Sequence, residues 1–163
     1  MSTLEKNVLD ILTTDARITA KQMAAMFSVT ENEVLACIEK LEKDGVLVKY
    51  TAIINSEKTE NSLVEALIEV KVNPKKKEGF DGIAAQISSF PEVKAVYLMS
   101  GAYDLAVFLE DTSLQKVARF VSERISTFDG VLSTATHFIL KKYKIEGVLT
   151  EKEDADKRNQ IQV

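Results

Sequence analysis

Hydrophobic residues in the first 55 positions recur every three or four residues in three segments, and this spacing predicts three helices. The first helix is expected over about residues 4–13. The second begins after Thr19 and the third after Thr30, because each threonine is followed three residues later by Gln or Glu, the pattern of a capping box. Only Ser28 and Val29 separate the second helix from the third, which predicts a helix-turn-helix.

Two short apolar segments follow the third helix, which Asp44 and Gly45 are expected to end. Residues 46–48 and 52–54 have the composition of β-strands, and we expect them to form the wing of a winged helix-turn-helix. The polar residues that follow lack apolar periodicity, which is typical of a linker. The expected organisation is a winged helix-turn-helix domain over residues 1–55, a linker over 56–62, a second domain over 63–149 and a frayed polar tail over 150–163.

In the second half of the chain, segments with period-two alternation flank segments with helical spacing. The predicted order is β-α-β-β-α-β, which is typical of an antiparallel, ferredoxin-like sheet with both helices on one face. The fold class is therefore α+β. We expect Gly101 to supply the positive φ of a tight hairpin turn and a capping box to begin at Thr112. The predicted strands are 63–72, 93–100, 103–110 and 131–141, and the helices carry the apolar positions 80–87 and 114–125.

The middle strands of this predicted sheet are apolar on both faces. Tyr97 and Met99 lie on one face of their strand, and Val96 and Leu98 lie on the other. Two helices can cover only one face of a sheet, so the second apolar face needs another partner. A homodimer formed through the sheet is the simplest arrangement that buries it.

Composition narrows the class of protein further. The single cysteine, Cys37, excludes an internal disulfide and suits a reducing compartment. The N-terminus lacks the basic and apolar pattern of a signal peptide, and no apolar segment reaches membrane-spanning length. We therefore expect a cytoplasmic protein that does not contact membranes.

Neither half carries the excess of basic residues that is typical of tight non-specific DNA binding. Residues 1–55 hold six basic and eight acidic side chains, and residues 62–149 hold eleven of each. The third helix is expected to expose an acidic set with few groups suited to base edges or phosphates. This set consists of Glu31, Asn32, Glu33, Leu35, Ala36, Cys37, Glu39 and Lys40.

Residues for catalysis, cofactors or metals are scarce. His137 is the only histidine and is expected to be a packed or edge residue of a strand. One histidine and one cysteine are too few for a zinc site, and the sequence does not complete a Ser-His-Asp or Cys-His set. No glycine-rich phosphate loop is present, and Lys75, Lys76 and Lys77 are expected to lie in a solvated loop. We expect no cofactor, no metal and no enzymatic activity.

A small-ligand site is the chemistry that remains. Asp104 follows the predicted turn, and Thr134 and Thr136 share one face of the last strand. An amino acid needs an acceptor for its ammonium group and donors for its carboxylate, which Asp104 and the two hydroxyls could supply with loop amides. The alternative is that Asp104 only binds the backbone of its own loop.

Four segments together carry a resemblance to a known family. They are residues 11–17 (Ile-Leu-Thr-Thr-Asp-Ala-Arg), residues 38–47 (Ile-Glu-Lys-Leu-Glu-Lys-Asp-Gly-Val-Leu), residues 101–105 (Gly-Ala-Tyr-Asp-Leu), and Gly130-Val131 followed by Thr134 and Thr136. In this order and spacing, the chain resembles the Lrp/AsnC, or feast-famine, transcriptional regulators over nearly its full length. The resemblance implies a winged helix-turn-helix joined to a βαββαβ effector domain that dimerises through its sheets and often assembles to tetramers or octamers. It also implies that small effectors, usually amino acids, bind between neighbouring domains and change assembly or affinity for double-stranded DNA.

The resemblance also places the effector site. The positions that carry over or line the site are Met99, Ser100, Gly101, Ala102, Tyr103, Asp104, Thr134 and Thr136. The residues that we expect to contact DNA are Arg17, Lys21, Thr30, Asn32, Lys40 and Lys49. Two alternatives stay open: an amino-acid sensor or partner-binding module whose helix-turn-helix binds DNA weakly or not at all, and an enzyme on a ferredoxin-like sheet.

Overall fold

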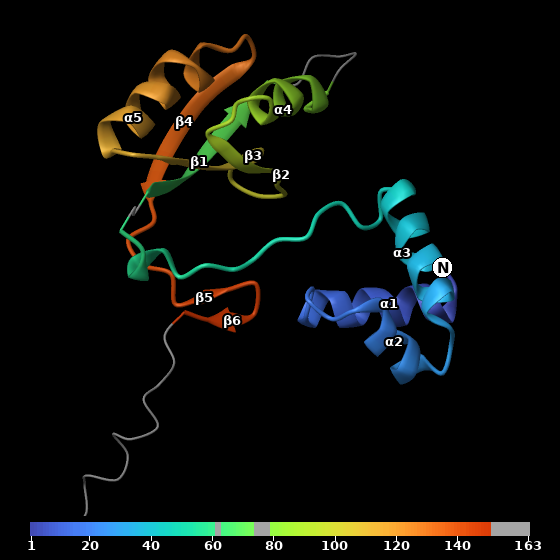
Figure 1. Ribbon diagram of the computed structural model, residues 1–163. Coiled ribbons are helices and arrows are strands. Elements are labelled where there is room, and N and C mark those ends of the chain that lie inside the picture. The colour runs from blue at the N-terminus through green and yellow to red at the C-terminus, as the bar shows by residue number, and fades with distance from the viewer. Residues whose placement is uncertain (61–62, 74–78, 151–163) are drawn as a thin grey trace, which may run out of the picture. The chain divides into compact units, whose positions relative to one another are not determined.

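The structure is a computed structural model that describes residues 1–60, 63–73 and 79–150 (Figure 1). The chain divides into two compact units, Met1–Ile53 and Ile54–Val163. Three predicted features lie partly or wholly outside the described residues: the end of the linker, the loop with Lys75, Lys76 and Lys77, and the polar tail after residue 150.

The first unit consists of three helices, α1 (Thr3–Thr14), α2 (Ala20–Phe27) and α3 (Glu31–Lys43), as the apolar spacing predicts. The capping boxes at Thr19 and Thr30 are confirmed, since each hydroxyl accepts the N–H of the third helical residue. A third capping box, formed by Ser2 and Glu5 at the start of α1, was not predicted. The buried core of this unit contains Val8, Met23, Ala24, Val34, Cys37 and Leu41.

Cys37 is buried, although the sequence pattern placed it on the exposed side of the third helix. This residue keeps only 8% of its surface exposed and packs in the core between the helices. The reason is its spacing: Cys37 follows Val34 by three residues and precedes Leu41 by four, so all three lie on one face of α3. Ile38, at the next position along the helix, is half-buried beside them.

The two strands expected over residues 46–48 and 52–54 do not form in this structure, in which residues 46–54 contain no strand. The three residues between the expected strands, Lys49, Tyr50 and Thr51, include none of the Gly, Asn or Asp residues that favour a tight hairpin turn. A hairpin without further partners is also only marginally stable. The segment begins instead as a helix C-cap, in which Gly45 has φ +68° and the N–H of Val46 donates to Leu41.

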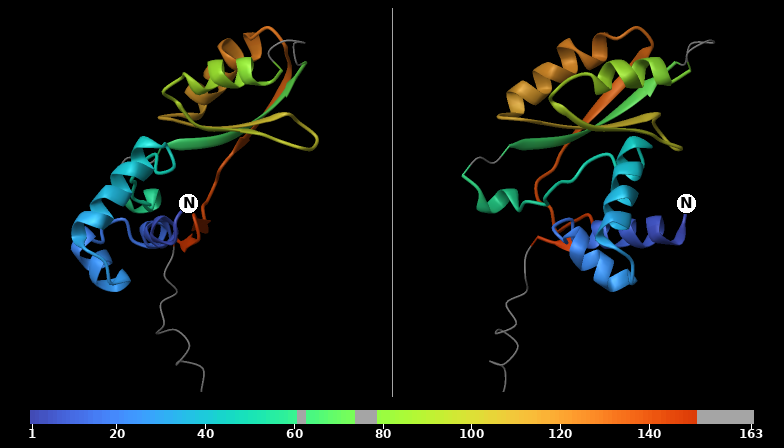
Figure 2. Two further views of the ribbon diagram at one scale, coloured as in Figure 1. Left: turned by 90° about the vertical axis from the view of Figure 1, so that its right-hand side faces the viewer. Right: turned by 45° about the vertical axis from the view of Figure 1, so that its right-hand side comes forward.

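The second unit is an antiparallel four-stranded sheet in the order β2-β3-β1-β4, with both long helices on one face (Figure 2). This confirms the ferredoxin-like βαββαβ arrangement and the α+β class. Two short 3₁₀ helices and a small C-terminal hairpin were not predicted. The elements are β1 (Val64–Val72), α4 (Asp81–Ser88), β2 (Val93–Leu98), β3 (Leu105–Asp111), α5 (Leu114–Glu123) and β4 (Val131–Phe138), with 3₁₀ turns at Ser56–Lys58 and Ile125–Thr127 and the hairpin β5 (Lys144–Ile145) and β6 (Val148–Leu149).

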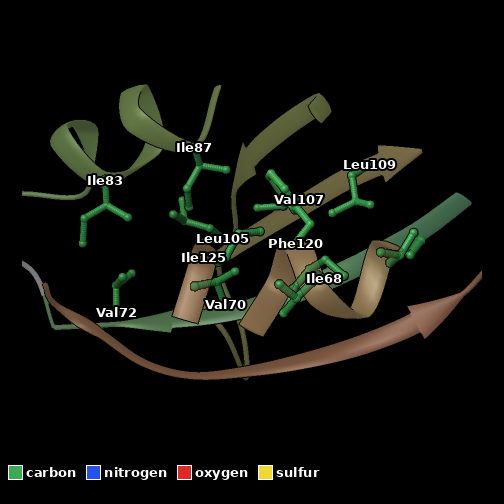
Figure 3. Close-up of a cluster of buried hydrophobic side chains, with 13 residues drawn as sticks. Ile68, Val70, Val72, Ile83, Ile87, Leu105, Val107, Leu109, Phe120 and Ile125 are labelled. Atoms are coloured by element: carbon green, nitrogen blue, oxygen red, sulfur yellow. The ribbon is translucent and has the colours of Figure 1, made fainter. Parts of the chain in front are cut away.

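The core of the second unit lies between the sheet and its two helices (Figure 3). Alternate residues of β1, among them Ile68 and Val70, face Ile87 of α4 and Phe120 of α5 across this layer. The opposite residues of β1 face away from the helices, because side chains alternate along a strand. The sheet therefore has a helix-covered face and an open face.

Two local expectations in this unit are wrong. Gly101 does not have a positive φ; strands β2 and β3 are joined by a six-residue connection, residues 99–104, which the N–H of Met99 closes by donating to the carbonyl of Asp104. A connection of this length reverses direction without the two-residue turn that requires a positive φ. The N-cap of α5 is Ser113 rather than Thr112, because the N–H and hydroxyl of Thr112 both bind Asp111.

Candidate functional site

Asp104 lies where β3 begins, beside the end of β1. Its Oδ2 accepts the N–H of Val72 at 2.8 Å, and its own N–H donates to the carbonyl of Val70 at 3.1 Å. At this point the pairing of β1 with β4 shifts register, between Lys71 and Val72. The side chain of Asp104 thus extends the hydrogen bonding between β1 and β3 beyond their last backbone pair.

This geometry refines the alternative role of Asp104. The carboxylate binds β1 rather than the backbone of its own loop, so it fixes the connection 99–104 against the central strand. Within the described parts of the chain, its second oxygen, Oδ1, accepts no hydrogen bond. One oxygen is therefore bound to β1, and no described residue donates a hydrogen bond to the other.

The two threonines lie on the other side of β1. Thr134 pairs with Val70 and Thr136 with Ile68, and directly paired residues share a face of the sheet. Since Ile68 and Val70 face the helices, both threonines lie on the helix-covered face. The hydroxyl of Thr134 is 3.1 Å from that of Ser126, in the 3₁₀ turn after α5, a partner that the sequence pattern did not reveal.

The predicted effector residues therefore form two groups within one chain. Val70 lies between Leu105 of β3 and Thr134 of β4, so the two flanking strands are about 10 Å apart at this level. Asp104 and the threonines are not brought into contact. In the connection beside Asp104, Met99, Ser100, Gly101 and Ala102 are exposed and Tyr103 is half-buried.

The open face of the sheet has an apolar centre. The rings of Tyr97 and Phe108 pack edge to face with centroids 5.9 Å apart, and Leu67 lies beside Phe108 in the pairing of β1 with β3. Charged groups surround this centre in pairs: Glu69 lies 3.3 Å from His137, Lys94 lies 2.5 Å from Glu110, and Glu65 pairs with Lys142. The prediction of an apolar second face thus holds for its centre, and Tyr97 keeps 55% of its surface exposed.

The candidate DNA interface lies on α3. Counting 100° per residue, the positions opposite the buried Val34, Cys37 and Leu41 are those that point away from the core of the unit. Leu35 and Ala36 belong to this side but were not expected to contact DNA, because their side chains are apolar. Lys43 also lies on this side and was not among the expected residues. The outward stripe is Asn32, Leu35, Ala36, Glu39 and Lys43, all of them exposed.

Some of the residues expected to contact DNA bind other residues of the chain, and others are exposed. Lys40 Nζ lies 2.6 Å from Glu5 Oε1, and this pair joins α3 to α1. The Lys40 ammonium, together with the N–H of Ser2, holds the pKa of Glu5 below its ordinary value, and Glu5 in turn raises the pKa of Lys40. Thr30 is the N-cap of α3 and binds Glu33. Arg17, Lys21, Asn32 and Lys49 are exposed.

No helix in residues 1–60, 63–73 and 79–150 is long and apolar enough to cross a membrane. In the same residues, no group of three or more His, Cys, Asp or Glu side chains is arranged to hold a metal ion.

Comparisons with known proteins match both units. Residues 65–149 match the family model of the Lrp/AsnC ligand binding domain, and residues 1–48 match a winged helix-turn-helix DNA-binding model. The HTH-type transcriptional regulator YugG of Bacillus subtilis is 48% identical over 155 residues, which cover 94% of this chain and 93% of YugG.

Solved structures give the same fold. AsnC of E. coli aligns with a TM-score of 0.68 at 20% identity, over 89% of this chain and 95% of AsnC. The transcriptional regulator NMB0573 of Neisseria meningitidis, solved as a complex with L-Met, aligns with a TM-score of 0.69 at 22% identity, over 89% and 93% of the two chains.

Proposed function

The chain belongs to the Lrp/AsnC family of transcriptional regulators, and on this premise we propose that an amino acid binds its βαββαβ domain and changes its assembly or its affinity for double-stranded DNA. The observation that carries the effector part is the position of Asp104. One carboxylate oxygen is fixed by Val72 and the other is free among the described residues, beside an exposed connection whose backbone N–H groups can donate.

The distance between the two groups of predicted ligand residues supports a site shared by two copies. The ammonium and carboxylate of an α-amino acid are attached to the same carbon, so one ligand cannot reach Asp104 and Thr134 across the width of two strand spacings. In the proposed site, Asp104 of one copy binds the ammonium group. Backbone N–H groups of the same connection, or threonines of a neighbouring copy, bind the carboxylate.

The open face of the sheet supports the proposed homodimer. Its centre combines the exposed ring of Tyr97 with Phe108 and Leu67, and no helix of the second unit covers it (Figure 2). A symmetric dimer would bury the same patch twice, once from each copy. Assembly of such dimers into tetramers or octamers would then bring further sheets and connections together.

The test uses the full chain in a thermal-shift panel of the twenty amino acids. A ligand that binds only the folded state at about a hundred times its Kd stabilises by about 2.7 kcal/mol, so binding should raise the Tm measurably. The active amino acid should then change the molar mass or the DNA affinity of the protein. The effector proposal fails when no amino acid shifts the Tm of the wild type.

A second function is favoured by the chemistry of α3. The helix begins with Glu31 and Glu33, which suit its N-terminal dipole but repel phosphate, and Lys40 is bound to Glu5. These features suit an amino-acid sensor or partner-binding module whose helix-turn-helix binds DNA weakly. Binding to a protein partner without any salt-dependent affinity for DNA at low salt would favour this second function.

A further inference from the structure

The outward side of α3 combines an amide, two apolar residues and an acidic residue. Asn32, Leu35, Ala36 and Glu39 follow one another at spacings of three, one and three residues, opposite the buried stripe. Leu35 keeps 50% of its surface exposed and has no core role. In a helix-turn-helix, the N-terminal residues of the second helix contact base edges in the major groove.

Charged residues beside this stripe bind other residues of the chain. Lys40 is paired with Glu5, Glu33 binds the hydroxyl of Thr30, and Glu42 accepts the hydroxyl of Tyr50 at 3.1 Å. The first three turns of α3 therefore present no free Arg or Lys, the side chains that most often read guanine. Lys43 lies at the end of the helix, where a cation suits a phosphate or the helix dipole.

We propose that α3 reads A·T base pairs, with Asn32 bound to adenine and with Leu35 and Ala36 packed on thymine methyl groups. The amide of Asn32 can donate to N7 and accept from the N6 amino group of adenine in a bidentate arrangement. Apolar side chains one turn further along the helix fit the thymine C5-methyl, which only A·T and T·A pairs present in the major groove. This inference rests on the proposed DNA binding and states which bases the bound helix recognises.

The experiment starts with a random library of double-stranded DNA, enriched on the full-length protein at about 50 mM salt so that phosphate contacts hold weak complexes. Enriched duplexes should carry A·T pairs at the positions that α3 contacts. Replacing those thymines by uracil removes only the methyl groups, and it should weaken binding several-fold. Leu35→Ala should reduce this difference between thymine and uracil to the part that Ala36 contributes.

Asn32→Ala tests the adenine contact. It should weaken binding to the enriched duplex by about 5- to 150-fold and make the four base pairs nearly equivalent at one position. Leu114→Ala is a matched control for Leu35→Ala, because Leu114 is also 50% exposed on a helix but lies in the second unit. It should leave the discrimination between thymine and uracil unchanged.

The outcomes separate this inference from the proposed function. Enrichment of G·C contacts, equal affinity for thymine and uracil duplexes, or an Asn32→Ala variant that loses affinity equally for all duplexes would overturn the A·T assignment and leave DNA binding intact. Absence of binding to every duplex at low salt would overturn DNA binding itself.

Discussion

The carboxylate of Asp104 accepts a hydrogen bond from the backbone N–H of Val72 at 2.8 Å, across 32 residues of sequence. Val72 is almost fully buried, so its N–H has no access to water as an alternative partner. The same side chain is the candidate acceptor for an effector ammonium group. A structural role and a ligand role therefore coincide in one residue, and two substitutions can separate them.

Asp104→Asn should keep the hydrogen bond to Val72 through the amide oxygen and lose the negative charge. We expect a Tm close to that of the wild type and no further rise when the active amino acid is added. Asp104→Ala should in addition leave the buried N–H of Val72 unpaired, at a cost of about 1–3 kcal/mol. Both are measured by thermal shift, with Asp81→Asn as an exposed control. A full ligand response in Asp104→Asn would show that Asp104 serves the fold alone.

The pair formed by Glu5 and Lys40 should make the first unit sensitive to acid. The pKa of Glu5 is lowered on folding, chiefly by the hydrogen bond from Lys40, so its stabilising contribution is complete above the ordinary carboxyl pKa. That contribution is lost as the pH falls through the lowered value. The Tm of the first unit, followed by circular dichroism, should hold near neutral pH and fall in acid.

Glu5→Gln should lower the Tm at neutral pH and flatten its dependence on acid, because the variant has no carboxylate to protonate. Glu123→Gln is the control, since Glu123 forms only an exposed pair with Arg119 on α5. An unchanged acid profile in Glu5→Gln would contradict the assigned role of the pair.

Gly130 should not tolerate a side chain. Its φ is +99°, and a Cβ would lie 3.0 Å from Cδ1 of Ile83 and 3.4 Å from the carbonyl of Asn73. We expect Gly130→Ala to cost about 1–3 kcal/mol, from the backbone conformation and the contact together. Gly147→Ala is the matched control, because its φ is +83° but no atom lies within 4 Å of the added Cβ. Urea unfolding should show the larger loss for Gly130→Ala; equal losses would show that the contact with Ile83 relaxes freely.

The sequence predicted features that depend on local chemistry. Capping boxes at Thr19 and Thr30 follow from side chains that bind backbone three residues away, and this geometry needs no tertiary information. The order of the elements and the antiparallel sheet also followed, because alternating segments of this length and order favour one compact antiparallel sheet. The family resemblance and the residue pattern both predicted this βαββαβ arrangement.

Features that depend on several segments at once were not predictable. Cys37 is buried because α1 and α2 pack on the face it shares with Val34, and a polarity pattern does not fix the edge of that face. The strands expected over residues 46–48 and 52–54 do not form, because strands need partners as well as composition. The hydrogen bond from the N–H of Val72 to the carboxylate of Asp104, 32 residues later, also needs the folded register.

The open face of the sheet should be the surface through which two copies associate, and Tyr97 tests it. Tyr97 packs edge to face on Phe108 and remains 55% exposed, so its ring is open to contact with a second copy. Tyr97→Glu would place a charge at this apolar centre, and twofold symmetry would place two charges in each interface. Burying an unpaired carboxylate costs several kcal/mol, which should convert the dimer to monomer at low micromolar concentration.

Tyr97→Phe should remain dimeric, and so should Leu114→Glu, which puts the same charge on the helix side of the sheet. Molar mass from light scattering measures all three, and a dimeric Tyr97→Glu variant would exclude the open face as the interface.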